Sequence, residues 1–448
     1  MSKYETYKRT DVEWVDTVPE HWQVTKLKLL GNFTSSGIDK LILEDEGSVK
    51  MVNYMDVYGN KDSIINSSFD FMVVTCPDSK KEVHNVIKGD LIFTPSSETI
   101  EDIGLSALID EDLDNTVYSY HVLRFRFAKK LEHKFKKYLC NNFYVLSQFS
   151  SNAKGTTRQI LSREEFKNTV VFIPTPAEQL TIANYLDHQT QKIDRLIANK
   201  KAQADKLKEL RQIEINNAVT KGLNPNAEMK DSGIDWLGKI PKNWETDRLK
   251  NVTYINQEVI TEKTSPDYEL KYIDIGNVTS NGEFLELQEM TFSEAPSRAR
   301  RKPKHNSIIL STVRTYLRAI AFVQNPDDNL IASTGFAVID AYENLFDAKY
   351  LFYQMTSHIV VERVIANSDG VSYPAISSTK LGDMKIILPP KVEQELISNY
   401  LEDRTTAIDK LIKNIEAQIE KLQEVRKIKI YEAVTGKIKV NAYVEATA

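Results

Sequence analysis

Residues 174–220 read PTPAEQLTIANYLDHQTQKIDRLIANKKAQADKLKELRQIEINNAVT, and residues 389–435 read PPKVEQELISNYLEDRTTAIDKLIKNIEAQIEKLQEVRKIKIYEAVT. Aligned without gaps, the two stretches are identical at roughly half of their positions, which identifies an internal repeat. Neither stretch has a Gly, or a Pro after its opening residues. Each is therefore expected to form one helix of about forty residues and about 60 Å. The repeat indicates that the chain was built by duplication.

Apolar residues step by seven in both stretches, which is typical of a helix that packs along a seam against another helix. One predicted row contains Leu186, Ile193, Leu207, Leu401, Ile408, Ile415 and Leu422. A second predicted row contains Leu196, Leu210, Leu411 and Val425. The registers match, so each helix is the expected partner of the other, and a pseudo-two-fold relation would make them antiparallel. The alternative is two unrelated amphipathic surface helices.

A second repeat precedes each long helix. Val12-Glu13-Trp14, Pro19 and Trp22 reappear as Ile234-Asp235-Trp236, Pro241 and Trp244, and these two copies hold all four tryptophans of the chain. This repeat has an offset of 222 residues (236 minus 14), whereas the helical repeat has an offset of 215 (400 minus 185). Each unit therefore combines a constant frame with an interior whose length differs by about seven residues.

The two interiors are predicted to be mixed α/β (α+β) domains on one ground plan. The expected strands are Met51-Val52, Phe71–Val74, Asp90–Phe93 and Tyr120–Phe125 in the first, and Lys271–Ile273, Ser307–Leu310, Ala319–Val323 and Gly335–Ile339 in the second. Helices are expected at 135–147 and 348–365. The predicted domains are 1–173 and 223–388, and the spacer helices are 174–222 and 389–448, the latter including the C-terminal tail.

Composition narrows the class of protein. A chain of 448 residues with 41% hydrophobic and 27% charged residues predicts two or three globular domains. The sequence has no apolar run that could span a bilayer and no signal-like N-terminus, so we expect a cytoplasmic protein without membrane partners. Cys76 and Cys140 lack metal-ligand spacing and suit a reducing compartment. The net charge of −5 does not favour nucleic acid, but local basic patches act within a Debye length of about 8 Å.

The sequence contains no recognisable catalytic motif. Phosphate loops, dinucleotide fingerprints and Gly-x-Ser-x-Gly elbows are missing, and His21 is matched by Asn243, which makes it an improbable metal ligand. Asp267, Glu269 and Lys271 resemble part of a metal-dependent nuclease cluster, but its first acid is crowded against the others. Asn325-Pro326 resembles a methyltransferase motif, yet Asp327 follows where a stacking residue is needed. It is expected to form a turn.

Basic and polar loops favour nucleic-acid binding. One loop carries Arg298, Arg300, Arg301, Lys302 and Lys304, and the first interior carries lysines between 129 and 137. Such clusters neutralise phosphates, and base edges require paired donors and acceptors. The candidate contacts of the first domain are Ser96, Ser97, Glu98, Tyr118, Tyr120, Lys154, Thr156 and Arg158. Those of the second are Asn277, Thr279, Arg298, Arg300, Arg301, Arg314, Thr315, Tyr316, Arg318, Ser372 and Tyr373. For any one residue, a solvated surface charge is the alternative.

Taken together, the paired tryptophans, the Pro-x-x-x-Glu-Gln entry to each helix and the Ile-Asp-x-Leu-Ile heptads before Ala-Val-Thr resemble the specificity subunits of Type I restriction-modification systems. The likeness covers nearly the whole chain. It implies two target recognition domains, each reading one half of a split double-stranded DNA sequence, separated by an antiparallel helix pair. The sequence departs from the first copy at Tyr373-Pro374, which lacks the basic residue that Arg158 provides, so a phosphate contact at this point of the second domain is not expected with the same support.

The resemblance further implies a non-catalytic bacterial or archaeal chain that binds no cofactor itself. Its partners would be modification (adenine N6-methyltransferase) subunits, two of them, which use S-adenosylmethionine and dock on the helices. Restriction subunits that use ATP and Mg²⁺ would join them in some complexes. Two alternatives stay open at this point: a stand-alone Mg²⁺-dependent nuclease or methyltransferase, and a coiled-coil scaffold that binds protein alone.

Overall fold

The computed structural model describes residues 2–441 and divides the chain into two compact units. Unit 1 contains Met1–Lys200 and Ala417–Ala448, and unit 2 contains Lys201–Glu416. Each unit thus holds one globular domain with one end of each long helix. Over the described residues, no helix has both the length and the hydropathy of a bilayer span.

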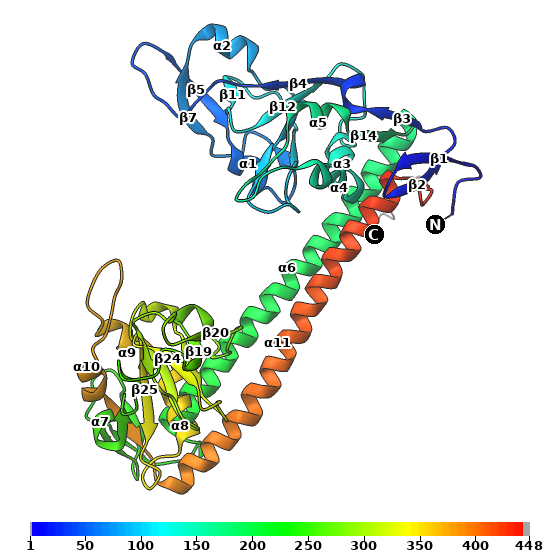
Figure 1. Cartoon of the computed structure of the whole chain (residues 1–448). Coiled ribbons are helices and arrows are strands. Elements are labelled where there is room, and N and C mark those ends of the chain that lie inside the picture. Colours follow the sequence, from blue (N-terminus) through cyan, green and yellow to red (C-terminus); the bar gives the residue numbers. More distant parts are fainter. Residues whose placement is uncertain (1, 442–448) are drawn as a thin grey trace. The chain divides into compact units, whose positions relative to one another are not determined.

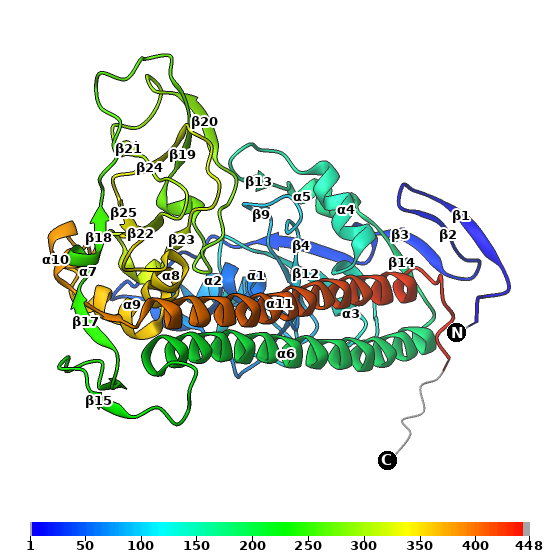
Figure 2. The same ribbon diagram turned by 90° about the horizontal axis from the view of Figure 1, so that it is seen from below.

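The two long helices of the repeat are present, as α6 (Pro176–Lys221) and α11 (Lys391–Val434). They run side by side (Figure 2). In unit 1, Arg426 forms an ion pair with Asp194 at 3.0 Å. In unit 2, Arg211 forms an ion pair with Asp409 at 3.0 Å. Arg211 and Asp409 are the repeat equivalents of Arg426 and Asp194, and each lies on the opposite long helix from its equivalent. This exchange confirms the predicted antiparallel arrangement.

The seam between these helices differs in part from the prediction. Leu186, Ile193, Leu401 and Ile408 are buried as expected, but Leu196, Leu210, Leu411 and Val425 are 42%, 36%, 51% and 41% exposed. The residues that complete the seam are Thr190, Ile197, Ala204, Thr405, Ile412 and Ile419. Each exposed residue directly precedes a position of the seam, because a heptad seam alternates steps of three and four. The second predicted row was therefore displaced by one residue.

Unit 1 contains a five-stranded and a three-stranded sheet. The first has the order β4-β12-β8-β10-β6: β4 (Gly31–Ser35), β12 (Leu123–Phe127), β8 (Leu91–Phe93), β10 (Ser106–Ile109) and β6 (Ile64–Ile65). The second has the order β11-β5-β7: β11 (Thr116–Tyr118), β5 (Gly47–Val52) and β7 (Met72–Cys76). Smaller pairs are β1 (Tyr7–Val12) with β2 (Val15–Pro19), β3 (Gln23–Lys26) with β14 (Val170–Ile173), and β9 (Ser96–Ser97) with β13 (Gln159–Ile160).

Unit 2 repeats this plan with two four-stranded sheets. One has the order β18-β25-β22-β23: β18 (Thr253–Ile255), β25 (Phe336–Ala341), β22 (Ile308–Ser311) and β23 (Ile320–Phe322). The other has the order β20-β19-β24-β21: β20 (Gln288–Thr291), β19 (Glu269–Ile273), β24 (Leu330–Ser333) and β21 (Ala299–Arg301). Smaller pairs are β15 (Met229–Asp231) with β16 (Lys239–Pro241), and β17 (Glu245–Arg248) with β26 (Lys385–Leu388).

Short helices cover these sheets (Figure 1). In unit 1 they are α1 (Tyr54–Tyr58), α2 (Asp78–Val83), α3 (Lys136–Cys140), α4 (Phe143–Asn152), α5 (Arg163–Asn168) and the 3₁₀ turn Leu27–Leu29. In unit 2 they are α7 (Leu249–Val252), α8 (Ala348–Thr356), α9 (His358–Ala366), α10 (Ser378–Asp383) and the 3₁₀ turns Ile275–Asn277 and Thr315–Leu317.

Two expected helices are each broken in two. Asn142 interrupts the first, and its side chain accepts a hydrogen bond from the Val145 backbone N–H as an N-cap. Ser357 interrupts the second, and its hydroxyl donates to the Gln354 carbonyl. Side chains that bond to nearby backbone compete with helix continuation, which explains both breaks. All the expected strands overlap observed ones, although β12 begins three residues later than predicted, at Leu123.

The constant frame joins each domain to its helix. The Trp22 indole N–H donates to Glu178, and that of Trp244 donates to Glu393, at 3.3 and 2.7 Å. The following Gln179 accepts a hydrogen bond from the Glu132 backbone N–H, as Gln394 does from that of Asp347. The Trp-Pro and Pro-x-x-x-Glu-Gln repeats therefore encode the joint between domain and helix.

Candidate nucleic-acid interface

In unit 1, the two loops predicted to face DNA meet. The loop after β8 carries β9, and its Ser96 and Ser97 pair with Ile160 and Gln159 of β13. Between them, Lys154 and Ile160 exchange backbone hydrogen bonds of 3.0 and 2.8 Å, which closes a hairpin over Gly155. Gly155 has a φ of +126°, and a Cβ there would lie 2.1 Å from the Arg158 carbonyl oxygen. Glycine is therefore required for this turn.

In unit 2, the equivalent loops meet in the same way. Asp369 and Ala375, which lie 215 residues after Lys154 and Ile160 (369 minus 154), exchange backbone hydrogen bonds of 2.8 and 2.9 Å. Val313, after β22, forms a β-bridge with Ala375. The Arg314 backbone N–H donates to the Pro374 carbonyl at 2.7 Å. The two domains thus present the same pair of loops.

Each pair of loops carries an arginine over a tyrosine ring. The Arg158 guanidinium carbon lies 5.6 Å from the centre of the Tyr54 ring, and that of Arg314 lies 4.8 Å from the centre of the Tyr373 ring. The Arg158 Nε also donates to the Ser96 hydroxyl at 3.1 Å. Tyr54, in α1, was not among the predicted residues, because no local pattern links it to a hairpin a hundred residues later.

Several predicted contacts are buried instead of exposed. Ser97, Tyr118 and Thr315 are 0%, 0% and 4% exposed. The Tyr118 hydroxyl donates to Thr34, and burial raises the pKa of its phenol. The Thr315 hydroxyl lies 2.9 Å from that of Ser368. These burials correct the expectation that the three side chains face DNA, since side chains enclosed by the protein cannot reach base edges.

Two arginines of the basic loop 298–304, and Arg318 beyond it, are already paired with carboxylates. Arg298, Arg300 and Arg318 form ion pairs with Asp274, Glu262 and Glu362, at 3.4, 3.0 and 2.6 Å. Burial lowers the pKa of the half-buried Arg301. A carboxylate beside a guanidinium competes with a phosphate, so this loop is a weaker candidate interface than the charge count indicated.

The remaining predicted residues fall into two groups. Asn277 and Thr279 form local turns: the Asn277 side chain donates to the Glu286 carbonyl, and the Thr279 hydroxyl accepts from the Glu283 N–H. The others are exposed on the loops: Glu98, Tyr120, Lys154, Thr156, Tyr316 and Ser372. Exposure leaves these six side chains accessible to a ligand.

Three lysines of the cluster in the first domain contact neighbouring side chains. Lys137 forms an ion pair with Asp187 of α6 at 2.7 Å, and Lys134 lies 3.9 Å from the same carboxylate. The Lys136 ammonium lies 4.7 Å from the centre of the Phe127 ring, and burial lowers its pKa. Lys136 and Lys137 therefore fasten α3, which corrects their assignment to phosphate binding. Lys129 and Lys130 are exposed and stay predicted phosphate contacts.

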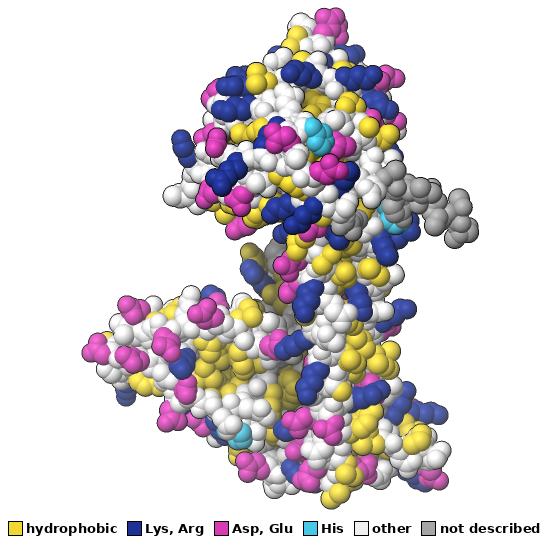
Figure 3. Space-filling model, turned by 90° about the vertical axis from the view of Figure 1, so that its right-hand side faces the viewer, with side chains coloured by type: hydrophobic (Ala, Val, Ile, Leu, Met, Phe, Trp, Pro, Cys, Tyr) yellow, Lys and Arg dark blue, Asp and Glu magenta, His cyan; other side chains and the backbone are white. Residues whose placement is uncertain are grey.

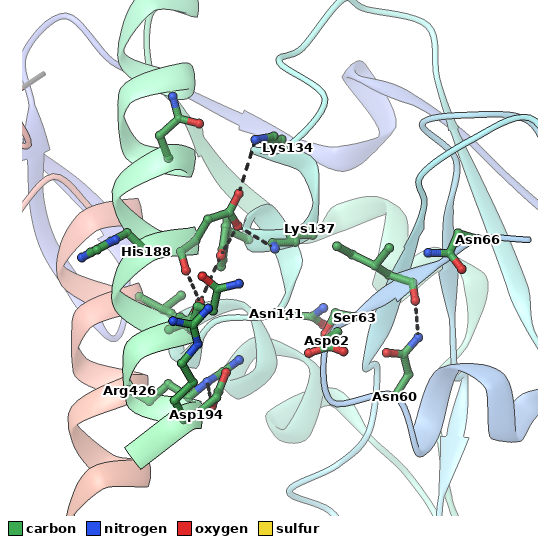
Figure 4. Close-up of a pocket in the computed structure, with 18 of the residues that line it drawn as sticks. Asn60, Asp62, Ser63, Asn66, Lys134, Lys137, Asn141, His188, Asp194 and Arg426 are labelled. Carbon is green, nitrogen blue, oxygen red and sulfur yellow. Dashed lines mark hydrogen bonds and ion pairs between the residues drawn. The ribbon is translucent and has the colours of Figure 1, made fainter. Parts of the chain in front are cut away.

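A polar groove of about 1120 Å³ lies between these lysines, residues 60–69 and the long helices (Figure 4). Lys134 and Lys137 point toward Asp187, and Arg426 pairs with Asp194 at its floor. Lys134, Lys137 and Arg426 are thus paired with carboxylates of the same groove. The groove offers no converging set of one charge that would bind an ion.

The weak nuclease cluster does not assemble. Lys271 forms ion pairs with Asp327 and Glu289, at 2.6 and 3.5 Å. Within residues 2–441, no three His, Cys, Asp or Glu side chains gather as metal ligands would. Asn325 has a φ of +45°, as expected of a turn. Both cysteines are buried thiols.

Comparisons with known proteins agree with this organisation. A family model described as the Type I restriction modification DNA specificity domain matches twice, at residues 19–207 and 241–421. A putative type I restriction enzyme MjaX specificity subunit from Methanocaldococcus jannaschii is 24% identical over 445 residues, or 98% of each chain. The MjaVIII specificity subunit of the same organism is 26% identical over 310 residues, or 66% of this chain and 70% of that one.

The fold also matches a solved structure. A chain from work on complex assembly and conformational transition of the type I R-M system has a TM-score of 0.67. It is 16% identical, and the match covers 94% of this chain and 99% of that one. Since the two matched segments span more than half of the sequence, the chain belongs to the family of Type I restriction-modification DNA specificity subunits.

Proposed function

We propose that each globular domain reads one half of a split DNA target and that the long helices hold the two readers at a constant separation. The observation that carries this proposal is the pair of converging loops at equivalent places in two domains whose loop sequences differ. Equivalent geometry with different side chains suits recognition of two different half-sequences. Base edges in the major groove are distinguished by the hydrogen-bonding side chains that reach them.

We further propose that the helices dock modification subunits, two per chain, which methylate adenine N6 with S-adenosylmethionine. Leu196, Leu210, Leu411 and Val425 support this, since they expose apolar surface at repeat-equivalent positions (196 to 411 and 210 to 425). Hydrophobic side chains lie along the helices on the face drawn in Figure 3. Apolar side chains that recur beside a seam are suited to a further helical partner.

The remaining partner assignments follow from the family. Restriction subunits that use ATP and Mg²⁺ would bind the assembled complex, and this chain itself would bind no cofactor. The whole assembly would work in the cytoplasm of a bacterium or archaeon.

The decisive experiment is single-molecule sequencing of DNA from cells that carry this chain with its modification subunit, compared with cells that lack only this chain. The expected result is N6-methyladenine at a split motif with a constant unread gap, lost on deletion of the chain. Methylation that is unchanged by the deletion would refute the reading role and favour a protein-only scaffold.

Docking is tested by charge insertion on the helices. Leu196→Glu together with Leu411→Glu should abolish copurification of the modification subunit, because each charge would be buried against an apolar partner. The matched control is Gln203→Glu, an exposed position on α6. Undiminished copurification of the double variant would place the docking surface elsewhere.

A further inference from the structure

The two arginine–tyrosine stacks come from opposite elements in the two domains. In unit 1 the arginine, Arg158, lies on the Gly155 hairpin, and the tyrosine comes from α1. In unit 2 the tyrosine, Tyr373, takes the hairpin position of Arg158, and the arginine comes from the loop after β22. The second domain therefore recovers a stacked guanidinium beside the hairpin although its hairpin lacks a basic residue.

The Arg158 and Arg314 guanidinium groups differ from the other arginines of these loops in their ionic partners. Both arginines are exposed, and neither has a carboxylate partner among the ion pairs of residues 2–441. Within residues 2–441, the Arg158 guanidinium donates one side-chain hydrogen bond, from Nε to Ser96, which leaves its two terminal nitrogens for a ligand. By contrast, Arg300 lies 4.9 Å from the centre of the Phe292 ring but is bound to Glu262.

The backbone around Arg314 indicates a specialised position. Arg314 and Arg318 have φ values of +50° and +55°, at the two ends of the 3₁₀ turn Thr315–Leu317. This left-handed region is disfavoured for residues with a Cβ and clusters at ligand-binding sites. The Arg314 N–H bond to Pro374 and the ring of Tyr373 hold the arginine in this conformation.

We propose that each stack reads one guanine in the half-site of its own domain, with Arg158 on Tyr54 in the first and Arg314 on Tyr373 in the second. This inference rests on the proposed function and assigns a base to it. The two terminal nitrogens of a guanidinium match the O6 and N7 acceptors of guanine in the major groove. Stacking on the ring orients the guanidinium before binding, so less side-chain freedom is lost on contact.

The test replaces each arginine by lysine in the full complex. Arg158→Lys and Arg314→Lys keep the positive charge but lose the planar fork. Each should remove the requirement for guanine at one position of one half-site and leave the other half-site unchanged. Methylation of the original motif should fall about 10- to 100-fold, the usual cost of a lost bidentate base contact.

The matched control is Arg248→Lys, an exposed arginine outside both loops that pairs with Asp383 at 3.3 Å, which should leave the motif and its methylation unchanged. Tyr373→Ala should weaken the Arg314 half-site alone, and Tyr373→Phe, which keeps the ring, should rescue this loss.

Three results would overturn the assignment: a wild-type half-site without a G·C pair, lysine variants with full activity on an unchanged motif, or loss that is equal on all sequences. The last two would make the arginines phosphate contacts. Failure of the proposed function itself looks different, because the wild type would then produce no methylated motif that depends on this chain.

Discussion

Units 1 and 2 share their frame and differ in their loops. At the frame, His21 and Asn243 occupy the same place and bond to Glu178 and Glu393 respectively, although one is an imidazole and the other an amide. At the loops, the arginine of the stack comes from the hairpin in unit 1 and from the loop after β22 in unit 2. The two units therefore share specific hydrogen bonds in the frame, whereas their loops share only the position at which a guanidinium group is presented.

The chain ends add a second contrast between the units. In unit 2, Gly222 at the end of α6 packs on Trp244 within one continuous stretch. In unit 1, Gly436 at the end of α11 packs on Pro19 and Trp22, and Ser2 pairs with Lys439. The same joint is thus closed by two ends of the chain in unit 1 and by a covalent linker in unit 2.

The largest expected effect comes from removing the frame tryptophans. Trp22→Ala and Trp244→Ala, both at fully buried positions, should each destabilise the unit that contains it by about 3–5 kcal/mol. Hydrogen–deuterium exchange of peptides from each unit measures this. Trp14→Ala, at a half-buried position, is the milder control. Equal loss of protection in both units would show that they do not behave independently.

Alanine substitutions at Gly436 and Gly222 should distinguish the joint of unit 1 from the joint of unit 2. A Cβ at Gly436 would lie 2.4 Å from the Pro19 ring, and one at Gly222 would lie 3.0 Å from Trp244. Gly436→Ala should therefore cost about 2–3 kcal/mol and Gly222→Ala about 1–2 kcal/mol in urea unfolding.

The control for both is Gly233→Ala, where φ is +67° but nothing lies within 4 Å of the added Cβ. It should show the backbone cost alone, about 1 kcal/mol. A variant at Gly436 that is no worse than this control would contradict the close packing of the C-terminal helix end on Pro19.

The frame of unit 1 should depend on pH through Glu178. Burial by itself would raise the pKa of this carboxyl, but hydrogen bonds from Thr175, His21 and Trp22 outweigh it and lower the pKa to about 2. A lowered folded-state pKa adds stability above the unfolded value near 4.5 and loses it as the pH falls toward 2. Glu178→Gln should therefore cost about 1 kcal/mol near pH 6 and progressively less below pH 4.5.

The measurement is chemical unfolding of wild type and variant between pH 3 and 6, followed by tryptophan fluorescence. A penalty that does not shrink on acidification would mean that the charge of Glu178 is not what matters. Glu393→Gln in unit 2 is the comparison variant, because Asn243 can bond to an amide as it does to the carboxylate.

The smallest effect is expected at the two repeated ion pairs of the helices. Arg426→Ala and Arg211→Ala should each cost about 0.2–1 kcal/mol, less at high salt, because both pairs are partly exposed. Unit 2 retains a second pair between Arg404 and Glu214 at 3.1 Å, so Arg211→Ala should be the milder change. Hydrogen–deuterium exchange of the helix amides at two salt concentrations measures the difference. A larger loss of protection in Arg211→Ala than in Arg426→Ala would argue against support from Arg404.

Sequence alone determined the duplication, both long helices, their antiparallel pairing and the two mixed α/β domains. These follow from periodicity and repeated motifs, which are local and can be counted along the chain.

Only the tertiary structure decided which side chains of those elements are available. Leu196 and Ile197 are adjacent and both apolar, and the packing of α11 alone selects the second for the seam. Tyr54 meets Arg158, and Arg314 meets Tyr373, only once sheets and loops are assembled from distant segments. The sequence likewise does not show which partner a charged side chain has. Lys137 and Arg300 were predicted to bind phosphates, but the fold places Asp187 and Glu262 beside them.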